Sequence, residues 1–303
     1  MPTQPRAIED RRFLGIGFAL VAYLLFTVLD SSAKWMGLAG LPTQEVVFVR
    51  YSVHLALVLV VFLPRERKAL VTSRAPLLEI ARAVCLGSST VFNFLALLYL
   101  PLTTTAAIMF TMPIIICVLS IPLLGEHVGW RRWIAIVVGL SGVLIIIRPG
   151  TSTFHPAMLW SLLATTCGAG YSLLTRKLAG VDSTWTQNFY AAAVATACLL
   201  PFIFLNWTWP SDWRTWLAFS VIGVAGFVGH LFVTEAHRMA PASVLAPFSY
   251  TQILWMTSSS WLVFGQPPDT AVYVGAPIVV GSGLYIWLRE RTLHKTSTPI
   301  AGD

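Results

Sequence analysis

The sequence predicts an all-α integral membrane protein with ten transmembrane helices, arranged as two inverted five-helix repeats. Hydrophobic residues make up 56% of the chain and charged residues only 11%, whereas about a quarter of the residues of a soluble globular protein are charged. Apolar runs of about twenty residues, long enough to cross ~30 Å of hydrocarbon, follow one another along the chain. One sequence phrase also occurs twice, about 140 residues apart.

The apolar runs give the expected helices in chain order. They occupy residues 13–36, 43–63, 76–99, 103–123, 130–147, 156–178, 184–205, 213–236, 241–264 and 271–288. Residues 1–12 and 289–303 form polar tails outside these runs. A signal peptide is the alternative for the first run, but that run continues without a small-residue cleavage site. We therefore expect it to remain as the first helix.

The repeated phrase divides the chain into two units, residues 13–150 and 151–288. It aligns Ala96 with Ala236, Pro101 with Pro241 and Gly125 with Gly265. Each unit contains five apolar runs, and because five is odd, the sixth helix must start on the opposite side of the bilayer from the first. The two units are therefore expected to be antiparallel, related by a pseudo-two-fold axis in the membrane plane.

The basic residues predict which side of the membrane carries the ends of the chain. Most of the 20 Lys and Arg residues lie in the two tails and in the loops on the same side as the tails. The opposite side has only Lys34, Arg148 and Arg214. By the positive-inside rule, both termini are cytoplasmic. The expected location is a bacterial-type inner (cell) membrane, crossed many times.

Several function classes find no support in the residues. The net charge of +7 could suggest nucleic acid, but no basic cluster with interleaved aromatic residues is present. The four cysteines lie in apolar runs without metal-ligand spacing, and we expect no metal and no cofactor. An enzyme would need a nucleophile–base pair, an H-E-x-x-H motif or paired carboxylates in mid-membrane, and the sequence contains none of these.

The motifs of the first half carry a family resemblance. In order they are Phe94-Leu-Ala96-Leu-Leu-Tyr99-Leu-Pro101, then Met112-Pro113, then Leu123-Leu-Gly125-Glu126. Together with Phe48-Val-Arg50-Tyr51 in the second run, this order resembles the EamA family of the drug/metabolite transporter superfamily. The resemblance covers nearly the whole chain. It implies a carrier of small metabolites, such as an amino-acid exporter of the YddG type, with a central cavity between the repeats.

The expected function is therefore secondary transport of small metabolites, as an amino-acid exporter that works by alternating access. The expected partners are a small-molecule substrate, such as an amino acid, and the lipid bilayer. One alternative is a drug or cation efflux carrier of the same superfamily. Another, from a different class, is an intramembrane enzyme that acts on a lipid-linked substrate.

Polar residues in mid-helix provide the candidate substrate site, because an unpaired polar group in lipid is costly and should face another helix or a wet cavity. The expected cavity residues are Asn93, Ser89, Tyr99, Pro113, His230, Thr234, Ser249, Tyr250, Gln252, Trp255, Tyr23, Trp160 and Thr165. The expected coupling or gating residues are His230, Arg50, His54 and Glu126. Hydrogen bonding within the bundle is an alternative role for Ser89 and Asn93, as is pairing of Arg50 with Asp30.

Overall fold

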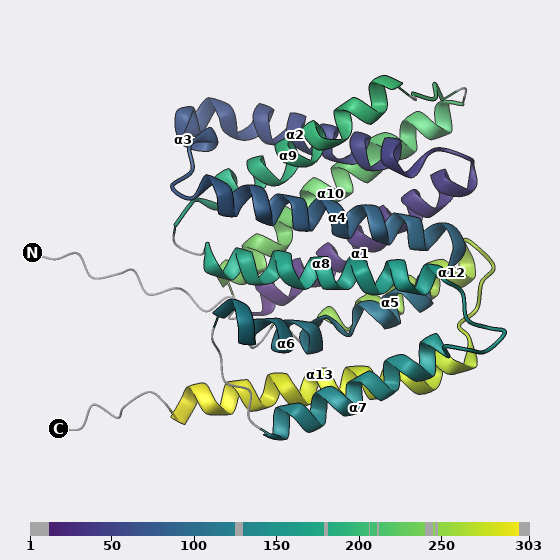
Figure 1. Ribbon diagram of the computed structural model, residues 1–303. Coiled ribbons are helices and arrows are strands. Elements are labelled where there is room, and N and C mark those ends of the chain that lie inside the picture. Colours follow the sequence, from purple (N-terminus) through teal and green to yellow (C-terminus); the bar gives the residue numbers. More distant parts are fainter. Residues whose placement is uncertain are drawn as a thin grey trace, which may run out of the picture.

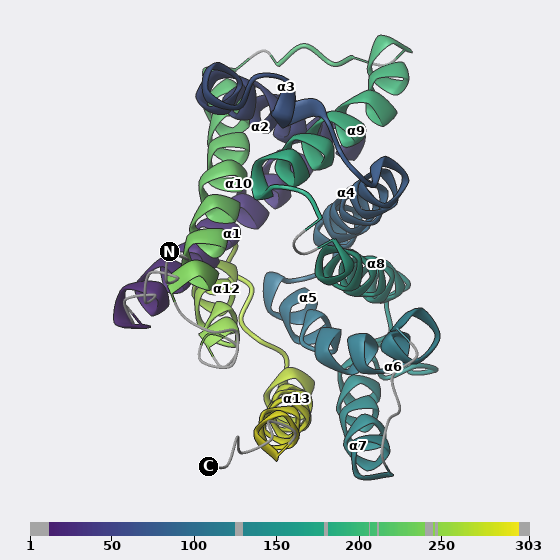
Figure 2. The same ribbon diagram turned by 90° about the vertical axis from the view of Figure 1, so that its left-hand side faces the viewer.

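The computed structural model describes residues 12–124, 130–178, 181–205, 207–210, 212–239, 245 and 248–296. Figures 1 and 2 show two perpendicular views of the chain. Its helices are α1 Arg12–Leu38, α2 Thr43–Glu66, α3 Lys68–Val71, α4 Pro76–Tyr99, α5 Leu102–Met109, α6 Met112–Leu124, α7 Trp130–Ile147, α8 Ala157–Lys177, α9 Thr184–Leu205, α10 Trp213–Met239, α12 Gln252–Leu262 and α13 Thr270–Thr296.

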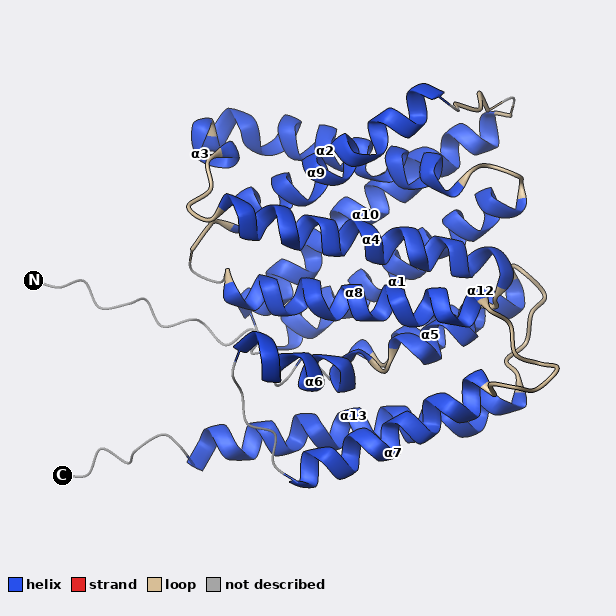
Figure 3. Ribbon diagram, viewed as in Figure 1, coloured by secondary structure: helices blue, strands red, loops and turns tan. Residues whose placement is uncertain are grey.

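Every regular element within the described residues is a helix, which confirms the predicted all-α class (Figure 3). Within the part of the chain that the structure describes, eight helical segments are long and apolar enough to cross a membrane, and a shorter apolar helix covers Trp133–Ile147. Large apolar side chains such as Leu77 and Phe204 point outward, as expected where lipid surrounds the protein. The run predicted at 241–264 lies partly outside the described residues, so the number of ten spans stays a prediction.

The helix contacts follow a two-fold pattern that matches the predicted repeat. The first half consists of α1, α2, α4, α5 with α6, and α7, and the second half repeats them in the same order as α8, α9, α10, α12 and α13. With this correspondence, the helix contacts between the halves occur in matching pairs. Helix α1 packs on α10 as α8 packs on α4, and α2 packs on α10 as α9 packs on α4. In the contacts α2–α9 and α7–α13, each helix packs against its own counterpart in the other half. This is the contact pattern expected of two copies related by a pseudo-two-fold axis.

Loop contacts show that the two copies run in opposite directions. The backbone N–H of Arg74, after α3, donates to the Asp182 carboxylate, after α8, at 2.9 Å, and the Ser73 hydroxyl donates to the same carboxylate. The ends of α2 and α8 therefore lie on one side of the bundle. Because α1 ends on the other side, where α2 begins, α1 and α8 are antiparallel (Figure 1). The inversion predicted from an odd repeat unit is confirmed.

Helices α7 and α13 cross closely at two glycines, at the edge of the bundle (Figure 2). A Cβ atom placed on Gly275 would lie 2.6 Å from the carbonyl oxygen of Gly142, and one placed on Gly142 would lie 2.9 Å from the carbonyl oxygen of Gly275. The Ser282 hydroxyl also donates to the carbonyl of Ala135 at 2.6 Å. Small residues allow this close approach of two helix backbones, as is common in membrane bundles.

Asp269 caps the start of α13. Its Oδ1 accepts a hydrogen bond from the backbone N–H of Ala271 at 3.1 Å, and the guanidinium of Arg148, just after α7, pairs with its Oδ2. The Ala271 N–H, together with Arg148 and the Thr270 hydroxyl, holds the pKa of Asp269 below its ordinary value. A lowered pKa means that this carboxylate stabilises the fold at neutral pH and loses that contribution as the pH falls through the folded-state pKa.

We expect Asp269→Ala to lower the stability of the purified protein by about 1 kcal/mol, because it removes the side-chain cap of α13. Asp269→Asn keeps a capping oxygen and loses only the charge, so its loss should be smaller. Thermal unfolding in detergent at neutral pH measures both changes. Equal losses in the two variants would show that the charge, and not the cap, supplies the stabilisation.

Candidate functional site

Buried polar side chains gather where α1, α2, α4 and α10 meet. Asp30, Arg50, His54 and Asn93 have only 3% to 7% of their surface exposed. His230 of α10 joins them, because its ring stacks on that of His54 with 6.0 Å between centroids. We call these five residues the central polar cluster. Charged groups inside a membrane bundle are costly and therefore mark functional sites.

The acidic part of the cluster joins α1 to α4. The side-chain amide of Asn93 donates to Asp30 Oδ1 at 3.0 Å. Asp30 lies about 12 Å before the end of α1, because this helix continues to Leu38. The carboxylate is therefore well inside the bundle. The carbonyl oxygen Oδ1 of Asn93 accepts no hydrogen bond within the described part of the chain.

The basic part of the cluster comes from α2. Arg50 donates to the hydroxyl of Thr90 at 2.9 Å, and its guanidinium lies 4.4 Å from the ring centroid of Tyr51. Thr90 and Asn93 are one turn apart on α4. This helix therefore holds Arg50 through Thr90 and Asp30 through Asn93. Of the groups that the structure describes, none bonds to Arg50 Nε. Gly226 of α10 faces this nitrogen, and a Cβ atom there would lie 3.5 Å from it.

The two histidines bring the halves of the chain together. His54 lies one turn beyond Arg50 on α2, and its ring meets Phe227 at 5.6 Å between centroids as well as His230. His230 in turn packs against Phe26 of α1, with ring centroids 5.1 Å apart. Neither ring nitrogen of His54 has a hydrogen-bond partner among the residues described. A neutral imidazole offers one donor and one acceptor.

The unpartnered atoms of the cluster define what it can bind. Arg50 offers a charged donor, Asn93 offers an acceptor and His54 offers one of each. Buried polar atoms in native proteins nearly always have a partner, so unpartnered ones indicate water or a ligand. A positive and a negative side chain both contribute, so the cluster suits a small ligand that carries both charges. Within the described residues no group of three or more metal-ligating side chains forms.

Comparison with known proteins decides the family. The model of the EamA-like transporter family matches residues 13–148 and 155–288, which together cover most of the chain. The chain belongs to the EamA-like transporter family. This confirms the resemblance seen in the first-half motifs. The chain is therefore a multi-pass membrane transporter of small metabolites and not an enzyme.

Several relatives of this EamA-like transporter are named by their substrates. It is 28% identical to an S-adenosylmethionine uptake transporter of Rickettsia felis, over 91% of this chain and 93% of the relative. It is 30% identical to a riboflavin transporter of Vibrio cholerae, over 97% of this chain and 100% of the relative. A pseudopaline exporter of Pseudomonas aeruginosa is 26% identical to it, over 88% of this chain and 93% of the relative. A crystal structure of a protein that is 19% identical in sequence shares the fold. It superposes with a TM-score of 0.61 over 95% of this chain and 99% of that protein.

In the structure of this EamA-like transporter, four of the residues predicted from the sequence lie close together. Asn93, His230, Arg50 and His54 all belong to the central polar cluster. Asp30, considered in the sequence only as a possible partner of Arg50, is the fifth member. Thr90 and Tyr51, which hold Arg50, were not predicted. Thr90 lies beside Ser89 and three residues before Asn93, so the polar run on α4 is the signal that could have identified it.

Other predicted cavity residues lie in contacts between or within helices. Ser89 donates to the carbonyl of Ala164 in α8 at 2.8 Å, and Thr165 donates to the carbonyl of Ser161 in its own helix at 2.8 Å. These bonds fit the bundle role considered for Ser89. The cavity role of both residues stays a prediction.

The predicted aromatic residues are spread over the transporter. The ring of Trp160 stacks on that of Phe92 with 5.6 Å between centroids. Tyr99, which is 61% exposed, stacks on His155 at the end of α4. Tyr23 packs with a separate small apolar cluster around Ala19, Ala236 and Leu245. The structure does not bring these three side chains together.

Of the remaining predicted residues, Pro113 and Tyr250 lie at the break between α5 and α6, and the others flank Tyr250 in the sequence or have side chains that lie outside the description. The break at 110–111 directly precedes Met112 and Pro113, and a proline interrupts the hydrogen bonding of a helix. The ring of Tyr250 lies 5.1 Å from that of Phe110 at this break. Ser249 and Gln252 lie beside Tyr250 at the start of α12. Thr234 lies in α10 one turn beyond His230, its side chain outside the description, and Glu126 lies outside the described residues altogether.

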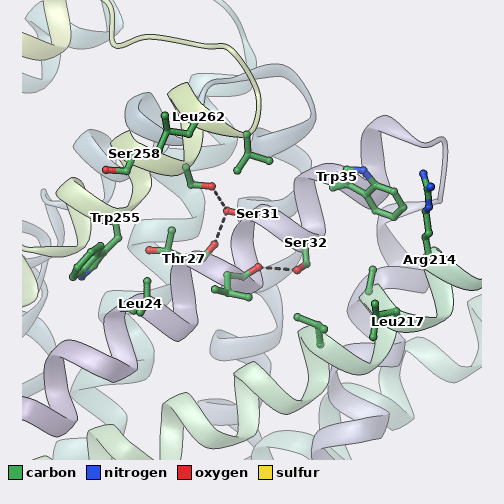
Figure 4. A pocket seen from close by; sticks show the side chains of 15 residues that line it. Leu24, Thr27, Ser31, Ser32, Trp35, Arg214, Leu217, Trp255, Ser258 and Leu262 are labelled. Carbon is green, nitrogen blue, oxygen red and sulfur yellow. Dashed lines mark hydrogen bonds between the residues drawn. The ribbon is translucent and has the colours of Figure 1, made fainter.

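A groove of about 520 Å³ lies on another face of α1, between this helix, α10 and α12 (Figure 4). Trp255, one of the predicted cavity residues, lines it. Ser31 and Ser259 share a hydrogen bond of 2.6 Å across its floor. Ser31 follows Asp30 directly in α1, so α1 separates the groove from the central polar cluster.

Proposed function

We propose that this transporter exports amino acids, or metabolites that carry a free amino-acid group, and that it binds this group in the central polar cluster. The observation that carries the proposal is the set of buried unpartnered atoms beside opposite charges. Arg50 presents a charged donor for a carboxylate, and His54 presents a further donor. Asp30 and the Asn93 oxygen present acceptors for an ammonium group.

The surroundings of the cluster strengthen these interactions. Its members are buried between packed helices, where the effective dielectric constant is well below that of water and charge–charge interactions are stronger. The guanidinium of an arginine also fits a carboxylate with two parallel hydrogen bonds, which fixes the orientation of the substrate. A zwitterion would therefore complete the hydrogen bonds of both charged side chains at once.

The substrates named for the relatives are consistent with this proposal in part. S-adenosylmethionine, the substrate named for the Rickettsia felis relative, ends in the ammonium and carboxylate groups of methionine. Riboflavin, the substrate named for the Vibrio cholerae relative, lacks both groups. The alternative of cation efflux is disfavoured by Arg50, because its buried guanidinium, whose charge also acts on Asp30, repels a permanent cation.

The proposed mechanism is alternating access, with residues 13–150 and 151–288 rocking around the cluster. Polar contacts link the two halves at both ends of the bundle. At one end Arg148 pairs with Asp269, and the backbone N–H of Thr208 donates to Glu45. At the other end Ser73 bonds Asp182, and Arg82 donates to a backbone carbonyl of α9. We propose that this second end, which also carries the basic loops, faces the cytoplasm.

Reconstituted vesicles test the substrate class and the direction. The purified protein is placed in proteoliposomes, and the uptake and efflux of labelled amino acids, S-adenosylmethionine, riboflavin and a cationic dye are followed. We expect flux for substrates with a free amino-acid group, with competition between them. Flux of riboflavin or the dye alone, without any amino-acid substrate, would overturn the proposal.

We expect Asn93→Ala to reduce flux at low substrate concentration by about tenfold, because it removes an acceptor for the ammonium group and the partner of Asp30. His230→Ala should also reduce flux, since it removes the ring on which His54 packs. Initial rates in proteoliposomes with equal amounts of protein measure both effects.

The matched control is Thr166→Ala, an exposed hydroxyl that bonds only the carbonyl of Leu162 in its own helix. Its flux should equal that of the unmodified protein. Unchanged rates in both Asn93→Ala and His230→Ala would remove the substrate site from the cluster while leaving the family and the fold unaffected.

A further inference from the structure

We propose that the groove between α1, α10 and α12 is a binding site for an anionic phospholipid, with the phosphate on Arg214 and one acyl chain along α1. The groove residues used in this argument are Leu24, Ser31, Trp35, Arg214, Trp255 and Ser259. This site is separate from the central polar cluster, and the proposal does not depend on the substrate.

The length of the groove matches one leaflet of a bilayer. Its α1 wall runs from Leu24 to Trp35, which is about 17 Å at 1.5 Å per residue. Half of a ~30 Å hydrocarbon core is about 15 Å. Figure 4 shows Trp35 and Arg214 at one end of the groove, and Leu24 and Trp255 at the other. An acyl chain of a single leaflet therefore fits from one end to the other.

The chemistry of the lining favours an acyl chain over a polar solute. The hydroxyls of Thr27, Ser31 and Ser32 already donate to backbone carbonyls of α1, and Ser31 also bonds Ser259. The remaining lining is largely leucine, valine and tryptophan. A polar substrate would find few free partners there, whereas an acyl chain needs none.

The charge lies at the end where a headgroup would be. Arg214 is the second residue of α10, and among the described residues that line the groove its exposed guanidinium is the only charged group. Trp35 stands beside it, and tryptophan prefers the depth of the lipid headgroups. A cation at headgroup depth above an apolar groove selects an anionic lipid over a zwitterionic one.

The contact that the repeat relates to this groove is packed more closely at one point. The pseudo-two-fold axis relates the α1–α12 contact to the contact between α8 and α6. In that contact the methyl group of Met112 covers Gly168, where an added Cβ atom would lie 2.9 Å from it. At Gly168, therefore, a side chain of the protein itself occupies the space beside α8.

Native mass spectrometry of the purified protein, titrated with phosphatidylglycerol or phosphatidylcholine of identical chains, tests the site. We expect the unmodified protein to bind phosphatidylglycerol more tightly, and Arg214→Gln to weaken that binding about tenfold without changing phosphatidylcholine binding. Arg148→Gln is the matched control, because Arg148 lies on the same side of the bundle outside the groove and should keep the preference.

A second variant tests the acyl-chain part independently of the charge. Ser258→Trp should fill the groove and remove one bound lipid of either kind, while the thermal transition of the protein stays unchanged. The proposal is overturned if the unmodified protein shows no preference or if Arg148→Gln loses it equally. It is also overturned if Ser258→Trp binds as many lipids as before, or if soluble substrates displace the phosphatidylglycerol.

Discussion

Arg50→Gln is expected to abolish amino-acid transport while the protein still reaches the membrane. Glutamine can keep a hydrogen bond to Thr90, but it removes the positive charge that attracts the Asp30 carboxylate and that would bind the substrate carboxylate. Removing one member of a buried, hydrogen-bonded charge pair, here the proposed pair of Arg50 with the substrate carboxylate, costs about 2–5 kcal/mol, so flux at low substrate concentration should fall about 100-fold or more. Initial rates in proteoliposomes, normalised to inserted protein, measure the loss.

A double variant separates the binding role of Arg50 from its structural role. Arg50→Gln leaves Asp30 as a buried carboxylate without the attraction of the Arg50 charge, which destabilises the bundle by itself. Adding Asp30→Asn removes that unpaired charge and should restore the thermal transition. If Arg50 binds the substrate, the double variant is stable and still does not transport. Normal flux in the double variant would show that the two charges only support each other.

The class of the fold and the inversion of its halves could be predicted because they depend on properties of whole segments. Composition alone excludes a soluble protein, and an odd number of spans per repeat forces the copies to be antiparallel. That Arg50 and His54 share one face of their helix could also be predicted, because residues four apart on a helix are neighbours. These inferences need no knowledge of how one helix is rotated against another.

The partners of the site residues could not be predicted for the opposite reason. When nearly every face of a helix is apolar, hydrophobic periodicity does not show which face meets which neighbour. The bonds from Asn93 to Asp30 and from Arg50 to Thr90 depend on such rotations. Tyr99 and Trp160 illustrate the same difficulty, because an aromatic residue with a polar atom suits a cavity and the membrane interface equally well.

Gly275→Ala is expected to destabilise the protein by about 1–3 kcal/mol, because the added methyl group would overpack the crossing of α13 and α7. The obstacle is the carbonyl oxygen of Gly142, at 2.6 Å from the new Cβ atom. A backbone atom cannot rotate away as a side chain can, so the helices themselves must separate. Thermal unfolding in detergent and the yield of monodisperse protein measure the effect.

Gly281→Ala on the same helix is the matched control. A Cβ atom there would meet nothing within 4 Å, so only the helix propensity changes. Alanine is favoured over glycine inside a helix by about 1 kcal/mol, which should make this variant at least as stable as the unmodified protein. The same propensity gain acts in Gly275→Ala, so the difference between the two variants isolates the cost of the close crossing. Equal transitions in both would mean that the two backbones do not meet at these glycines.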